Sequence, residues 1–175
     1  MMIKRPESLA GDWGPLLMVA LAAAAFTEPT TAQWPELPAA AEVVPFSVVA
    51  DGQTNQQSAI RERQRRVITT ATEWGAFWAE LHGLVEPKPA APAIDFASQM
   101  VVAAAMGQRN TGGYSIAIEG VFAANGKLLV RVEERSPGSS CMVTQALTAP
   151  VTAAVVARSD AAVEFVERAI TTPCG

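Results

Sequence analysis

The side chains that could act as an acid, a base or a nucleophile are few and scattered in this sequence. His82 is the only histidine, and it precedes Gly83 at the end of a predicted helix, where a positive charge is favoured. Ser139 and Ser140 are candidate nucleophiles only as serines in a loop, and a serine hydrolase would have to be assembled around His82. We therefore expect a protein that is not an enzyme, with a hydrolase of unrecognised type as an alternative.

Metal and cofactor sites lack the residues that they need. One histidine and two widely separated cysteines fit neither a zinc site nor a CxxC redox pair, and no EF-hand spacing is present. The Asn110-Thr111-Gly112-Gly113 segment contains glycine, but no lysine follows it and it leads into a strand, which argues against a phosphate loop. We expect no metal and no cofactor.

The charge balance argues against a nucleic-acid partner. The formal net charge is −4, whereas nucleic-acid binders carry a basic surplus. Basic residues cluster only at Arg61, Arg63, Arg65 and Arg66, with Glu62 and Gln64 between them. This cluster is typical of a solvated edge segment, and an anion site is the alternative.

The first residues are typical of a signal peptide. Lys4 and Arg5 precede an unbroken apolar run of eleven residues, 16–26, whereas a membrane-spanning helix needs about 20. Thr30-Thr31-Ala32 offers a cleavage site of small residues, with cleavage nearer Ala25 as an alternative. We expect residues 1–32 to be a signal peptide, with export to the periplasm or beyond and no membrane span after cleavage; an uncleaved anchor is the alternative.

Cys141 and Cys174 are the only two cysteines. In an oxidising compartment a single disulfide between them is the natural interpretation, because exported proteins keep such bonds. The bond would tie the C-terminal tail to the body of the protein. Two unpaired thiols would require the chain to stay in a reducing compartment.

The rest of the chain reads as a linker followed by one domain. Half of the residues are hydrophobic and 17% are charged, which excludes a disordered chain. The Gln-Trp-Pro-Glu-Leu-Pro start of residues 33–44 predicts an extended linker. Residues 45–175 are predicted to form a single globular domain.

One helix is clearly predicted, over Thr70–His82. Thr70 and Glu73 have the spacing of a capping box, and Gly83 offers a stop. An apolar stripe follows at helical spacing, formed by Trp74, Phe77, Trp78 and Leu81. We interpret this stripe as the main anchor of the core, with a surface aromatic patch as the alternative.

Strands are predicted on both sides of this helix. The Asn125-Gly126 pair is a strong hairpin signal, and residues 160–170 could be a strand or a helix. The predicted strands are 46–50, an edge strand from 61 to 68, 100–106, 114–119, 127–134 and 151–157. The fold class is therefore α+β, a mostly antiparallel sheet of five to seven strands packed against one main aromatic-faced helix.

The sequence resembles a bacterial family of extracytoplasmic proteins, the C-terminal domain of the protease-complex subunit PrcB. The resemblance covers about residues 60–174. It is carried by Met100–Met106, Gly107–Ile116, the Asn125-Gly126 hairpin, residues 132–137 and the Thr148-Ala149-Pro150 strand entry. It implies a module without known chemistry of its own, which partners a secreted subtilisin-like protease.

The segment from Asn110 to Tyr114 also looks like the binding loop of chagasin-like cysteine-protease inhibitors, and this resemblance implies a loop that sits on an immunoglobulin-like sandwich and fills the protease cleft. The doubled glycine departs from that pattern, and the long helix fits such a sandwich poorly. Gly112 and Gly113 permit a close backbone approach, and Tyr114 is a residue type found at interface hot spots. A strained turn with Tyr114 packed on the sheet is the structural alternative.

These observations predict a non-catalytic, secreted or periplasmic protein-binding module, an accessory or regulatory subunit of a protease. The predicted partner-binding residues are Asn110, Thr111, Gly112, Gly113 and Tyr114, with residues 135–140 as a neighbouring loop. Direct protease inhibition by the same loop is the first alternative. A hydrolase using Ser139 or Ser140 is the second.

Overall fold

The computed structural model describes residues 32–52 and 56–174, so the predicted signal peptide lies outside them apart from Ala32. One helix and eight strands form among these residues. They are β1 (Glu42–Val43), β2 (Phe46–Ala50), β3 (Gln64–Ile68), α1 (Ala71–Leu81), β4 (Gln99–Ala105), β5 (Ser115–Ala124), β6 (Lys127–Pro137), β7 (Val151–Ala157) and β8 (Ala162–Thr172).

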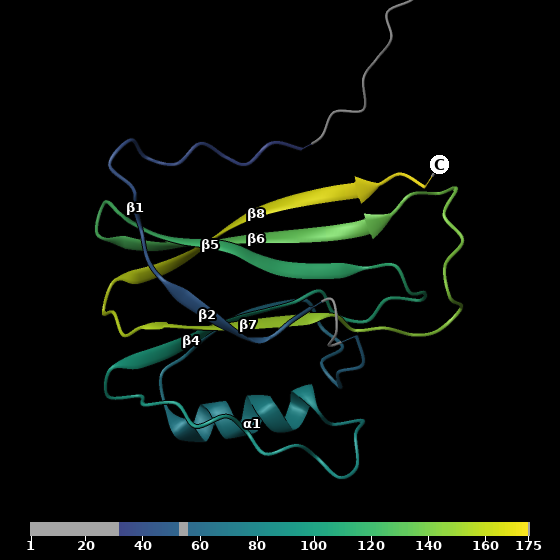
Figure 1. The fold of residues 1–175 in the computed structure, drawn as a ribbon, viewed down its shortest axis with the longest axis horizontal. Helices are drawn as coiled ribbons and strands as arrows, with labels where there is room; N and C mark the ends of the chain where they lie inside the picture. Colours follow the sequence, from purple (N-terminus) through teal and green to yellow (C-terminus); the bar gives the residue numbers. More distant parts are fainter. Residues whose placement is uncertain (1–31, 53–55, 175) are drawn as a thin grey trace, which may run out of the picture. The chain divides into compact units, whose positions relative to one another are not determined.

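The strands form two four-stranded sheets, with the orders β1-β5-β6-β8 and β2-β7-β4-β3. The sheets stack face to face, and α1 covers the outer face of the second one (Figure 1). All pairings are antiparallel except β6 with β8. The α+β class is confirmed in this coarse form, but the described residues make two sheets where the sequence predicted one.

Strand β4 explains why a second sheet is needed. Met100, Val102 and Ala104 point into the core between the two sheets, whereas Val101, Ala103 and Ala105 point into the core under α1. All six side chains are at most 1% exposed. A strand that is apolar on both faces needs a covering layer on each, so the β5–β6 hairpin covers one face and the helix covers the other.

The helix begins and ends close to its predicted bounds. Thr70 is the N-cap, and the capping box is complete: the Glu73 N–H donates to Thr70 Oγ1 at 3.2 Å, and the Thr70 N–H donates to Glu73 Oε2 at 3.1 Å. Trp74, Phe77 and Leu81 are buried against the sheet. The aromatic stripe is therefore a core anchor, as predicted.

The hairpin between β5 and β6 is confirmed at Asn125 and Gly126, whose φ values are 51° and 71°. Positive φ at both central residues is the geometry of a type I′ turn. The stretch after residue 160, which the sequence left open, is the long strand β8. Its parallel pairing with β6 places it at an edge of the first sheet.

The segment predicted as a linker, residues 33–44, packs on the outer face of the β1-β5-β6-β8 sheet. It contributes β1, which pairs with β5, and the Trp34 ring lies over the guanidinium groups of Arg131 and Arg168. Beneath them Glu133 is only 1% exposed and pairs with Arg135 and Arg168. The segment thus covers a buried ion-pair cluster.

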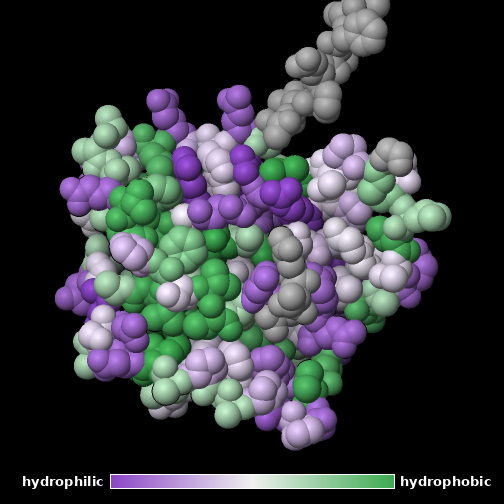
Figure 2. Space-filling view, in the orientation of Figure 1, coloured by the Kyte–Doolittle hydropathy of each residue, from purple (hydrophilic) through white to green (hydrophobic). Residues whose placement is uncertain are grey.

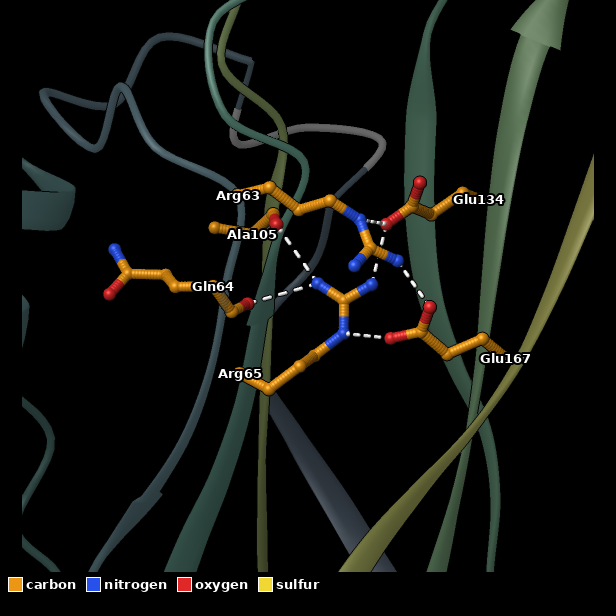
Figure 3. A network of polar contacts seen from close by, with 6 residues as sticks. All are labelled: Arg63, Gln64, Arg65, Ala105, Glu134 and Glu167. Atoms are coloured by element: carbon orange, nitrogen blue, oxygen red, sulfur yellow. Dashed lines mark hydrogen bonds and ion pairs between the residues drawn. The ribbon is translucent and has the colours of Figure 1, made fainter.

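A second cluster of charges lies between the two sheets, where β3 faces β6 and β8 (Figure 3). Arg65 Nη2 lies 2.5 Å from Glu134 Oε1, and Arg65 Nε lies 2.8 Å from Glu167 Oε1. Arg63 pairs with the same two carboxylates. Arg63 and Arg65 are therefore neutralised within the fold and do not form an anion site.

Candidate functional site

The predicted binding residues lie in a loop at one end of the sandwich, which we call the glycine loop (residues 107–114). It runs beside the loop between β6 and β7, the facing loop (residues 138–149). Arg109 and Thr148 exchange two backbone hydrogen bonds of 2.7 and 3.0 Å. The Gly112 N–H donates to the Thr144 carbonyl at 2.9 Å, and Thr148 Oγ1 donates to the Thr111 carbonyl at 2.8 Å. The two loops therefore form one hydrogen-bonded unit.

The two glycines permit this close approach. A Cβ added to Gly112 would lie 2.2 Å from Thr144 Oγ1. Gly113 has a φ of 86°, and a Cβ there would lie 2.9 Å from Val143 Cγ1 and 3.1 Å from Pro137 Cβ. A side chain at either position would force Thr144, Val143 or Pro137 to shift, and at Gly113 it would also strain the backbone.

Tyr114 is half-buried and packs against the core between the sheets. The guanidinium carbon of Arg109 lies 5.6 Å from the centre of its ring, a cation–π contact. Asn110 is exposed and Thr111 is half-buried. The tyrosine thus has a structural role on one side, while its ring also lines the surface groove between the loops.

This groove has a volume of about 730 Å³. A smaller hollow of about 120 Å³ adjoins it and shares Gln57, Leu147 and Thr148 with it. The groove is lined by Gln56, Gln57, residues 112–115, Arg135, Thr144, residues 146–148 and Thr172. We refer to the two hollows together as the loop groove.

Large apolar side chains are exposed in the facing loop and in the smaller hollow. Met142 is 101% exposed and Leu147 is 62% exposed, both in the facing loop. Leu84, which follows the helix and lines the smaller hollow, is 64% exposed. On the right of the molecule in Figure 2, where these loops lie, hydrophobic residues protrude among hydrophilic ones. Exposed apolar residues grouped in one region are typical of a binding surface.

Sequence reasoning missed these apolar residues. Residues 142–149 have neither the alternation of a strand nor the spacing of a helix, so their pattern predicted no structure. The available signal was a methionine and a leucine in a segment without the periodicity of a strand or a helix.

The disulfide between Cys141 and Cys174 is present, with a Cα–Cα distance of 5.0 Å. It attaches the facing loop to the segment that follows β8, and Ser140 Oγ donates to the Cys174 carbonyl at 3.1 Å. Gly138 N–H donates to the Thr172 carbonyl at 2.9 Å. The base of the facing loop is therefore fixed covalently and by hydrogen bonds.

Two of the residues considered for catalysis, His82 and Ser140, lie in different surroundings. The His82 ring packs on Trp78 with centroids 4.4 Å apart, and burial lowers the pKa of His82. Ser140 donates to the Cys174 carbonyl as described, and no hydrogen bond joins Ser140 to His82 among the described residues. Residues 32–52 and 56–174 contain no group of three side chains suited to hold a metal ion. None of their helices is long and apolar enough to cross a membrane.

Comparison with protein families gives a match over part of the chain. Residues 100–157, about a third of the chain, match the family described as PrcB C-terminal. The matched segment runs from β4 through the glycine loop, the β5–β6 hairpin and the facing loop to the end of β7. Comparisons with curated proteins and with solved structures return no match.

Proposed function

Because residues 100–157 of the chain belong to the PrcB C-terminal family, we propose that this protein is an exported, non-catalytic protein-binding module. Its role is that of an accessory or regulatory subunit of a protease. The loop groove is the contact surface, with the glycine loop and the facing loop as its two walls. The disulfide supports export, since such bonds persist in oxidising compartments.

The observation that carries this proposal is the exposure of two large apolar side chains in the facing loop: Leu147, which lines the groove, and Met142, which lies in the same loop. An exposed methionine side chain adapts to the shape of a partner surface because it has three rotatable bonds. Burial of the two side chains against a partner would contribute about 1.5–3 kcal/mol each.

The rigidity of the surrounding loops supports the same role. Backbone hydrogen bonds join the glycine loop to the facing loop, and the disulfide anchors the latter. A surface that is ordered before binding loses less conformational entropy when its partner arrives. Such loops present fixed contacts to another protein.

The test is a pull-down from the native envelope fraction with the disulfide-intact protein as bait. The expected result is recovery of a protease, identified by mass spectrometry, and its loss with Met142→Ser/Leu147→Ser. A matched control is Val43→Ser, because Val43 is 76% exposed and pairs near the opposite end of β5. Recovery of no protease with the unaltered bait would contradict the proposal.

Protease recovery with Tyr114→Ala and Tyr114→Phe tests whether the glycine loop contributes to binding. The phenylalanine variant keeps the ring on the core and beside Arg109, whereas the alanine variant removes it. We expect protease recovery to fall with alanine and to persist with phenylalanine.

Direct inhibition of a protease is the second candidate function. It is favoured by the presence of a two-sheet sandwich with the glycine loop at one end, which is the arrangement expected from the chagasin-like resemblance. Assays of a papain-like cysteine protease and of subtilisin with a peptide substrate test it. Inhibition that is lost with Tyr114→Ala would favour the inhibitor over the accessory subunit.

A further inference from the structure

The charged side chains that line the loop groove are both arginines. Arg61 lines the smaller hollow and Arg135 lines the larger one. No aspartate or glutamate is among the described residues that line either hollow. Arg109 lines neither hollow, and its guanidinium group lies over the Tyr114 ring. The groove is thus cationic on a chain whose formal net charge is −4.

The arginines differ in whether their charge is already paired with a carboxylate of the protein. Arg135 pairs with the buried carboxylate of Glu133, so part of its charge is satisfied within the protein. Arg61 is exposed and makes no ion pair among the described residues. Its neighbours Arg63 and Arg65 are engaged with Glu134 and Glu167. Arg61 is therefore the cation most available to a ligand.

Apolar contacts lie between the two cations. Leu147 belongs to both hollows, and Leu84 lies in the hollow that contains Arg61. Because the two hollows share three residues, the loop groove continues from Arg61 past Leu147 to Tyr114 and Arg135. A ligand that fills it must be elongated, with an apolar centre and negative charge toward its ends.

We propose that the loop groove binds an extended acidic segment of the partner protein. An apolar side chain of that segment packs on Leu147, and its carboxylates lie near Arg61 and Arg135. This inference rests on the proposed function and adds the chemistry of the partner. Complementary charge raises the association rate and the specificity of such contacts, and salt weakens it.

Two fluorescein-labelled decapeptides test the proposal by fluorescence anisotropy with the disulfide-intact protein. In the first, glutamates flank a central leucine pair; in the second, lysines replace the glutamates. We expect the acidic peptide to bind at least about tenfold more tightly, which corresponds to about 1.4 kcal/mol. Its affinity should fall as the sodium chloride concentration rises from about 0.05 to 0.5 M.

Charge-reversed variants locate the contact. Arg61→Glu should weaken binding of the acidic peptide about tenfold or more, and its fold should persist because only the Arg61 backbone carbonyl bonds to the glycine loop. Lys88→Glu is the matched control, since Lys88 is exposed and does not line either hollow. Equal binding of the two peptides, binding of neither, or equal loss in both variants would overturn the proposal.

Capture of the protease by Arg61→Glu separates the acidic-segment proposal from the proposed function. A protease captured equally by the unaltered protein and by Arg61→Glu would retain the binding role and overturn the acidic-segment proposal. Absence of any captured protease would contradict the proposed function itself.

Discussion

Arg168 lies between an aromatic ring and a buried carboxylate: its guanidinium carbon is 4.3 Å from the centre of the Trp34 ring, and its Nη2 pairs with Glu133. The Arg168 side chain is 20% exposed and the Glu133 side chain is fully buried. A buried carboxylate is tolerated only when it stays paired and shielded from competing water. Trp34 provides part of that shield from a segment far away in sequence.

The first prediction follows from this stack. Trp34→Ala should lower the free energy of unfolding by about 1–2 kcal/mol, because it removes the cation–π contacts and opens the Glu133 cluster to water. Urea denaturation followed by circular dichroism measures the change. Trp34→Phe keeps a ring over Arg168 and should lose less stability. Equal stability of all three proteins would show that residues 33–44 behave as a detached linker.

The second prediction concerns two of the three described glycines with positive φ values. Gly113 and Gly126 have φ of 86° and 71°, but only Gly113 is crowded, since nothing lies within 4 Å of a Cβ added to Gly126. Gly126→Ala should cost about 1–2 kcal/mol for the backbone conformation alone. Gly113→Ala should cost more, because its methyl group would press on Val143 and Pro137.

Chemical denaturation of the two variants side by side tests this difference. Gly126→Ala serves as the matched control for the φ penalty. A cost for Gly113→Ala no greater than that for Gly126→Ala would mean that the two loops separate without loss. The peptide affinity of Gly113→Ala should fall in parallel, since the same loops form the groove walls.

The third prediction is a pH dependence that originates in the cluster of Figure 3. Partial burial alone would raise the pKa of Glu167, but the hydrogen bond from Arg63 and the charges of Arg65 and Arg63 hold that pKa below its ordinary value of 4.5. A lowered carboxyl pKa stabilises the folded state above the unfolded pKa. This contribution is lost as the pH falls below 4.5 and through the pKa of the folded state.

Glu167→Gln removes the titrating group. The variant should be less stable than the unaltered protein near neutral pH, and the two stability curves should converge at low pH, where the native glutamate is also neutral. Urea midpoints measured across the acid range provide the readout. Glu86→Gln, an exposed residue in the loop after the helix, should leave the curve unchanged. A constant gap between Glu167→Gln and the unaltered protein at every pH would contradict the ion-pair explanation.

The fourth prediction concerns the disulfide. Cys141→Ser/Cys174→Ser should lower the free energy of unfolding by about 3–4 kcal/mol, as the chain-entropy model gives for a loop of this length. The bond joins residues 33 positions apart. Because it also anchors the facing loop, the variant should bind the acidic peptide more weakly even where it remains folded. Denaturation with and without dithiothreitol checks the first effect, and anisotropy at low denaturant concentration checks the second.

Local patterns in the sequence predicted the elements well. Thr70 and Glu73 specify the helix start through their own hydrogen bonds, and Asn125-Gly126 specifies the hairpin through its backbone preferences. The strand predicted over 127–134 lies within β6, where Leu128, Val130 and Val132 face the core between the sheets. Each of these features depends on residues that are near one another in the chain.

Features that depend on distant residues were not predictable in the same way. Nothing in the local pattern of Glu42–Val43 or Trp34 indicates that they pack on a sheet formed later in the chain. The partners of Arg63 and Arg65 come from β6 and β8, about 70 and 100 positions away. In the candidate site, the glycine loop was found from its residues, whereas the exposed Met142 and Leu147 became evident only once their surroundings were known.

Because β4 is buried on both faces, its register depends on a different property of its side chains from that of a half-buried strand. In a half-buried strand, a shift by one residue would expose apolar side chains and bury polar ones, so polarity rejects the error. In β4 both faces are apolar, and polarity gives no such discrimination. The size of the side chains does discriminate between registers. A shift by one residue would turn Met100 toward the helix, where β4 otherwise presents a valine and two alanines. The small side chains of Ala103 and Ala105 therefore help to select the correct register of β4. A larger residue at Ala103 should yield folding products with mispaired strands as well as a less stable native state.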